Sequence, residues 1–249
     1  MQMHYDKWYS PALGREMEIK VYGRGGKPVL YIPCQDGRFF DFENFGMLDA
    51  WAPYLEAGQA TVFSVDTIDA ETWSNTGGDP YWRIRRHEDW IRYLTEEAVP
   101  YIRTFCRGYG WQVDPGVMVF GCSLGATHAV NLYFRFPRLF DELLALSGVY
   151  EVSYGFDGYR DELVYLNAPL DYLADMPWDH PYLSLYRQNR GVVCVGQGPW
   201  ELVDSTRALQ HVLQEKDIPV WVDYWGYDVN HDWPWWFKQV AYFVPKLLD

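Results

Sequence analysis

The chain has 249 residues, 49% of them hydrophobic, which is enough for one sizeable core, and we expect a single domain over 1–249. Its formal net charge of −13 at pH 7 disfavours binding to nucleic acid or to an anionic membrane. The chain opens with no basic and apolar leader and has no apolar run near the ~18 residues that cross a bilayer. We therefore expect a soluble, cytoplasmic protein.

Short apolar runs alternate with amphipathic stretches, which predicts a mainly parallel sheet with helices on its faces. Two antiparallel edge strands are expected first, at 5–10 and 17–22. The central strands are expected at 28–32, 60–65, 117–122, 143–146, 191–195 and 220–224. Helices are expected at 83–106, with a kink or restart at Pro100, and at 124–134, 203–213 and 235–247.

One segment, 149–182, breaks this alternation. It is rich in Tyr, Asp, Gly and Pro and lies between two expected strands. Open α/β sheets bind their ligands at the carboxyl edge of the strands. We therefore predict an aromatic-rich, cap-like insertion over that edge.

The motif Gly121-Cys122-Ser123-Leu124-Gly125 joins a buried-strand pattern to a helical one. A sharp strand-to-helix turn holds its central residue in strained geometry, and flanking glycines let the backbone segments approach closely. Such a turn lifts the serine oxygen clear of the sheet, beside the positive end of the following helix. Ser123 is the predicted nucleophile.

A base should follow the nucleophile in the chain, in a loop after the last strand. His231 has this position, in the polar segment 226–233. Its imidazole would take the hydroxyl proton of Ser123 during attack and return it to the leaving group. His128, His180 and His211 fit less well, because they lie on helices or in the insertion.

The acid that orients the base should come from the loop after the strand at 191–195. Two carboxylates compete there, Glu201 and Asp204. We favour Glu201, because Asp204 has the position of a first-turn residue that stabilises the dipole of the following helix.

Acyl transfer places negative charge on the carbonyl oxygen, which needs preorganised N–H donors. The N–H of Leu124, the residue after the nucleophile, is one predicted donor. The second should come from the loop after an early strand, and the N–H of Arg38 is our assignment. The four cysteines form no CxxC pair and His87-Glu88-Asp89 lacks metalloprotease spacing, so no cofactor or metal is expected.

These motifs, together with Asp36-Gly37-Arg38, Phe136-Pro137, Leu146-Ser147-Gly148 and Asn230-His231-Asp232-Trp233, resemble the putative-esterase group of α/β-hydrolases. That group includes esterase D, feruloyl esterases and mycolyltransferases. The resemblance spans nearly the whole chain and implies the α/β-hydrolase fold, a Ser-acid-His triad and two backbone oxyanion donors. The chain departs from many members at Gly198-Pro199-Trp200-Glu201, where they carry Gly-x-x-Asp.

The leading hypothesis is a carboxylesterase that forms an acyl-enzyme on Ser123 and releases it to water. An acyltransferase with the same triad and a catalytically silent binding protein of this fold are the alternatives. The expected partner is a small-molecule or carbohydrate ester, and a homo-oligomer is compatible with the sequence.

Overall fold

A computed structural model describes residues 1–110 and 116–248. Eight strands form one sheet in the order β1-β2-β4-β3-β5-β6-β7-β8. The strands are β1 (Met3–Ser10), β2 (Arg15–Gly23), β3 (Lys27–Ile32), β4 (Ala60–Val65), β5 (Val117–Cys122), β6 (Phe140–Leu146), β7 (Arg190–Val195) and β8 (Trp221–Tyr224). Strand β2 pairs antiparallel with both β1 and β4 at one edge of the sheet, and the remaining pairs of described strands are parallel. The predicted α/β fold with a mainly parallel sheet is confirmed.

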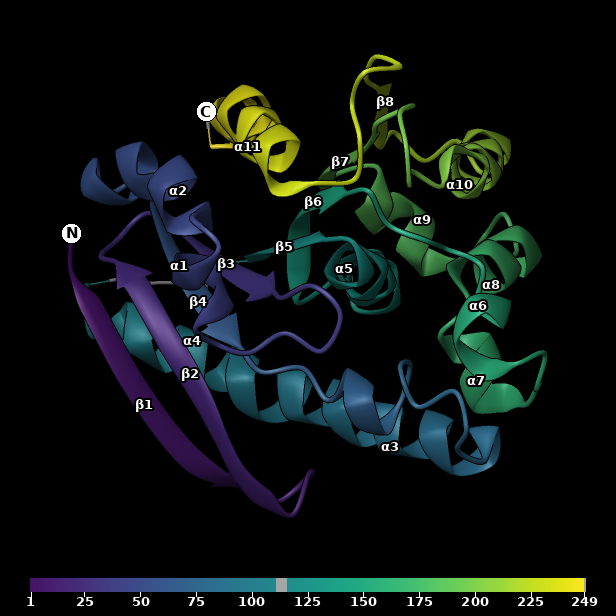
Figure 1. Cartoon of the computed structure of the whole chain (residues 1–249), viewed down its shortest axis with the longest axis horizontal. Coiled ribbons are helices and arrows are strands. Elements are labelled where there is room, and N and C mark those ends of the chain that lie inside the picture. The colour runs from purple at the N-terminus through teal and green to yellow at the C-terminus, as the bar shows by residue number, and fades with distance from the viewer. Residues whose placement is uncertain (111–115, 249) are drawn as a thin grey trace.

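Alternate residues of each strand face opposite sides of the sheet, and each side buries its own hydrophobic cluster. Strand β3 shows this directly, since Leu30 packs on one side and Tyr31 on the other. Helices α1 (Asp41–Asn44), α2 (Met47–Glu56) and α11 (Trp233–Leu247) cover one face (Figure 1). The other face carries α3 (Pro80–Arg92), α4 (Val99–Arg107), α5 (Leu124–Arg135) and α10 (Val203–Glu215).

The helix predicted at 83–106 is two α-helices joined by a π-helical segment, Tyr93–Ala98. Pro100 stands in the first turn of α4, where its missing N–H is tolerated. The predicted restart at this proline is therefore confirmed. Helix α2 was not predicted, because Pro53 lies inside it and masks the helical pattern.

The segment 149–182, predicted as an insertion, contains α6 (Ser153–Phe156), α7 (Glu162–Leu166) and α8 (Pro169–Asp175), and α9 (Pro181–Tyr186) follows. These short helices lie together beside α5 and α10, at the far end of the molecule from β1 (Figure 1). The aromatic side chains of this segment differ in exposure, since Tyr150 and Phe156 are buried whereas Tyr154 and Tyr165 are exposed. Among the described residues, no helix combines the length and the apolar composition needed to cross a bilayer.

Candidate active site

Ser123 stands at the turn between β5 and α5. Its backbone lies in the left-handed region at φ 56° and ψ −129°, which strains a non-glycine residue. A Cβ on Gly121 would lie 2.3 Å from the Gly125 carbonyl carbon. A Cβ on Gly125 would lie 2.3 Å from the Ile32 oxygen. Both glycines are therefore required, because only then can the helix start this close to the strands.

His231 lies within hydrogen-bonding distance of the serine. Its Nε2 is 2.9 Å from Ser123 Oγ. The loop that carries His231 is joined to the loop after β7 by backbone bonds, from His231 N to Pro199 O at 3.2 Å and from Gly198 N to Val229 O at 2.8 Å. These bonds tie the two loops together at the edge of the sheet and keep the imidazole beside the serine.

Of the two competing carboxylates, Glu201 is the one beside the imidazole. Its Oε2 lies 3.4 Å from His231 Nδ1, and its side chain is only 1% exposed. The side chain of Asp204 is 93% exposed and pairs with Arg207 at 2.7 Å. The structure therefore brings Ser123, His231 and Glu201 together and leaves Asp204 in solvent.

Two residues that were not predicted as site residues hold Glu201 in place. Ser147 Oγ donates to Glu201 Oε1 at 2.7 Å, and the Gly196 N–H donates to the same oxygen at 3.2 Å. Trp236 Nε1 donates in turn to Ser147 Oγ at 3.0 Å. The sequence signals for Ser147 were its place directly after a strand, at the same edge as the other site residues, and its presence in the motif Leu146-Ser147-Gly148.

Arg38 does not occupy the predicted oxyanion position. Its N–H donates to Asp41 Oδ2 at 2.9 Å, and its guanidinium pairs with Asp66 and Glu18. Arg38 is also absent from the residues that line the cavity at Ser123. The assignment of this N–H as an oxyanion donor therefore has no support in the geometry.

The N–H of Leu124 opens helix α5, so it has no acceptor inside the helix. Gln35, in the loop after β3, lines the Ser123 cavity. Its N–H makes no hydrogen bond to another described residue. These two N–H groups belong to segments in direct contact, since Gly125 packs against the carbonyl oxygens of Ile32 and Pro33.

The cavity at Ser123 has a volume of about 390 Å³. Phe45 and Trp233 stack in parallel in its wall, with ring centroids 4.8 Å apart. Cys34 also lines it, and burial raises the pKa of this thiol to about 12, so the thiol is protonated at neutral pH. Among the described residues, no group of three or more His, Cys, Asp or Glu side chains is arranged to hold a metal ion.

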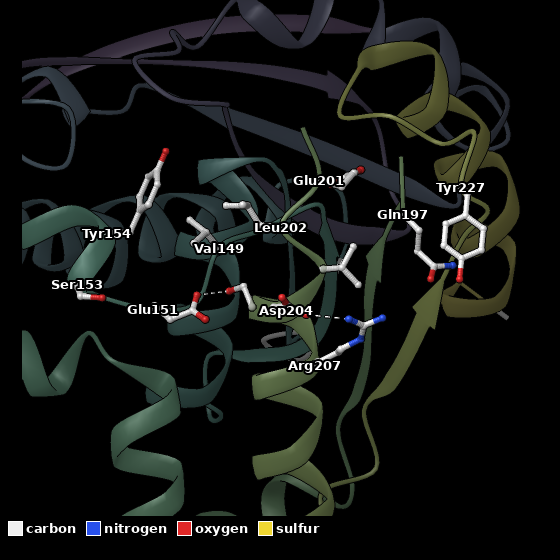
Figure 2. A pocket seen from close by; sticks show the side chains of 12 residues that line it. Val149, Glu151, Ser153, Tyr154, Gln197, Glu201, Leu202, Asp204, Arg207 and Tyr227 are labelled. Carbon is white, nitrogen blue, oxygen red and sulfur yellow. Dashed lines mark hydrogen bonds and ion pairs between the residues drawn. The ribbon is translucent and has the colours of Figure 1, made fainter. Parts of the chain in front are cut away.

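A larger cavity of about 660 Å³ lies along the loop that carries Glu201. Figure 2 shows Tyr154 and Tyr227 on opposite sides of it and the Asp204–Arg207 pair below. Tyr154 is 65% exposed and Tyr227 81% exposed, so both rings are open to a ligand. The cavity therefore offers aromatic surface beside the candidate active site.

The fold has close counterparts among solved structures. A ferulic acid esterase aligns with a TM-score of 0.75 at 16% identity, over 99% of this chain and 98% of that one. An S-formylglutathione hydrolase from Agrobacterium tumefaciens aligns with a TM-score of 0.72 at 16% identity, over 99% and 92%. A ferulic acid esterase from Anaeromyces mucronatus aligns with a TM-score of 0.72 at 12% identity, over 99% and 90%.

At these identities the likeness establishes the fold, which is that of the α/β-hydrolases. No curated protein matches the chain in sequence. The model of the family described as "Putative esterase" matches residues 10–247, which is nearly the whole chain. The chain therefore belongs to the Putative esterase family of α/β-hydrolases.

Proposed function

We propose that the protein is a serine carboxylesterase that forms an acyl-enzyme on Ser123. The observation that carries the proposal is the contact of 2.9 Å between His231 Nε2 and Ser123 Oγ. This is the distance at which an imidazole can take the hydroxyl proton. A catalytically silent relative would have no need to keep this contact.

In the first half of the reaction, Ser123 Oγ attacks the ester carbonyl carbon while His231 Nε2 takes its proton. The carbonyl oxygen becomes an oxyanion, which accepts hydrogen bonds from the N–H groups of Leu124 and Gln35. When the tetrahedral intermediate collapses, the alcohol oxygen leaves with the proton that His231 returns. The acyl group then remains on Ser123 Oγ.

In the second half, water replaces the alcohol. His231 takes a proton from the water, whose oxygen attacks the acyl carbon, and the carboxylic acid leaves as Ser123 recovers its proton. Glu201 accepts the Nδ1–H of His231, which keeps Nε2 free as the base and stabilises the imidazolium. Ser147 and the Gly196 N–H support this role, because they hold the carboxylate in one orientation.

The substrate that suits this site is an ester with a flat or apolar group. The stacked Phe45 and Trp233 rings line the Ser123 cavity and offer an apolar wall for such a group. We propose that a larger substrate extends into the cavity of Figure 2, past Tyr154. A panel of p-nitrophenyl esters from acetate to laurate, beside feruloyl esters and acetylated sugars, identifies the preferred group. Tyr154→Ala should raise KM for the larger esters and leave the acetate unchanged.

The nucleophile is tested with a fluorophosphonate probe. Native protein should be labelled, and Ser123→Ala should lose both labelling and esterase activity. Ser184→Ala is the matched control, because Ser184 is exposed and its hydroxyl only donates to the Pro181 carbonyl. Equal labelling of the native protein and Ser123→Ala would refute the proposal.

A further inference from the structure

A buried aspartate–histidine contact lies behind the cavity at Ser123. Asp69 begins a short 3₁₀ segment, Asp69–Glu71, shortly after β4, and His128 lies on α5. Asp69 Oδ1 is 2.9 Å from His128 Nε2, and the two side chains are 2% and 1% exposed. Neither lines the cavity, and the reaction described above uses neither. Burying a carboxylate is costly, so its partners define what it does.

The second oxygen of the same carboxylate binds the loop after β3. The Asp36 N–H donates to Asp69 Oδ2 at 3.3 Å. Asp36 lies in the left-handed region at φ 58° and lines the Ser123 cavity. Few residues other than glycine adopt this conformation, and aspartate is one of them. The bond to Asp69 thus restrains the residue next to Gln35.

On the other side, the contact between Asp69 and His128 restrains the start of α5. Leu124 and His128 are four residues apart and therefore lie on the same face of the helix, one turn from each other. The first turn has no room to shift toward the loop, because Gly125 already packs on the oxygens of Ile32 and Pro33. One carboxylate therefore contacts both segments that carry the proposed oxyanion donors.

We propose that Asp69 and His128 are positioning residues that set the separation of the Leu124 and Gln35 N–H groups. This inference rests on the proposed esterase activity. The oxyanion exists in the tetrahedral state and not in the bound ester, so the pair should act on kcat far more than on KM. His128 also packs against the rings of Trp73 and Trp90. If it acted through packing alone, its variants would lower stability without a selective loss of kcat.

Three variants of His128 separate these roles. His128→Leu keeps apolar bulk but removes the donor, and we expect kcat to fall about 10- to 100-fold with KM within about threefold. This is less than the 10²–10³-fold cost of deleting an oxyanion donor, because the N–H groups of Leu124 and Gln35 are displaced and not lost. His128→Gln retains an N–H that can reach Asp69, so kcat should recover to within about fivefold of native. His128→Asn is too short to reach it and should resemble His128→Leu.

Asp69→Leu tests the carboxylate. Leucine has a similar shape but no acceptor, so the contacts with His128 and with the Asp36 N–H are both lost. We expect the same loss of kcat as for His128→Leu. Glu88→Gln is the matched control, because it breaks a half-buried pair with Arg135 at the other end of α5. Glu88→Gln should lower the melting temperature and leave kcat within twofold of native.

The outcomes are distinct. If Ser123→Ala hydrolyses esters as well as native protein, the proposed function fails and the inference with it. If Ser123→Ala is inactive while Asp69→Leu and His128→Leu keep native kcat, the inference alone is overturned. An equal loss of kcat in Glu88→Gln would also overturn it, since general loosening of α5 would then explain the effect. Where Asp69→Leu or His128→Leu does not fold, the difference in kcat between His128→Gln and His128→Asn decides.

Discussion

The exchange of Glu201 for Gln is the most informative perturbation of the proposed triad. Glu201 Oε1 accepts hydrogen bonds from Ser147 Oγ and the Gly196 N–H, so the oxygen of a glutamine would remain on that side. Its NH₂ group would then face His231 Nδ1, which lies 3.4 Å from Glu201 Oε2. An NH₂ donor requires an unprotonated Nδ1, which places the proton on Nε2. In this tautomer Nε2 cannot accept the proton of Ser123.

The size of the effect follows from this change of tautomer. An aspartate-to-asparagine change in a serine protease triad lowers kcat by about 10⁴-fold. The distance of 3.4 Å is longer than the ~2.8 Å of a strong charge-assisted bond, so we expect about 10³-fold here. This corresponds to roughly 4 kcal/mol of transition-state stabilisation.

Hydrolysis of p-nitrophenyl acetate measures the effect, with Asp204→Asn as the matched control. Asp204 is exposed and pairs only with Arg207, so its variant should stay within twofold of native kcat/KM. The reasoning is refuted if Glu201→Gln retains more than a tenth of native activity, or if Asp204→Asn is the more damaged variant.

Three further predictions concern single residues near the site. Gly125→Ala places a Cβ 2.3 Å from the Ile32 oxygen and should lower esterase activity at least 10²-fold. Gly77→Ala, whose Cβ meets nothing within 4 Å, should keep native activity in the same assay. Equal activity of the two variants would contradict the packing argument. Because burial raises the pKa of Cys34 to about 12, iodoacetamide should label this thiol only slowly at pH 8. Mass spectrometry measures the labelling, and rapid modification of Cys34 in native protein would contradict this prediction. Burial lowers the pKa of His87 well below its usual range. Below about pH 6.5 the imidazole therefore binds a proton in the unfolded chain but stays neutral in the native state. Stability in urea should therefore fall below pH 6.5 by up to about 1.4 kcal/mol per pH unit, and His87→Phe should lose this contribution; parallel pH curves for both proteins would exclude it.

Local patterns were sufficient for most of the sheet and for the nucleophile. The buried strands have continuous apolar runs, so β4 and β5 begin and end where the sequence predicted. The turn at Ser123 depends on glycines within two residues of it, which is also a local property. Chain order then directed attention to His231, because the last loop of this fold returns to the same edge of the sheet.

The choice between Glu201 and Asp204 needed the tertiary structure. They lie three positions apart in the chain and both follow the same strand, so only burial and the direction of each side chain distinguish them. The error at Arg38 has the same origin, because the N–H of a loop residue takes its acceptor from a side chain, here Asp41, that the pattern of apolar residues does not place.

The sequence by itself determined the fold class, the strand-to-helix turn at Ser123 and the loop that supplies His231, because each depends on residue types at short spacing. Only the tertiary structure decided which carboxylate meets the imidazole. It alone also brought Asp69 to His128, which lie 59 residues apart, and to Asp36 in a third segment. Contacts of this kind depend on how loops from separate strands converge at one edge of the sheet. The spacing of residues along the chain does not predict this convergence.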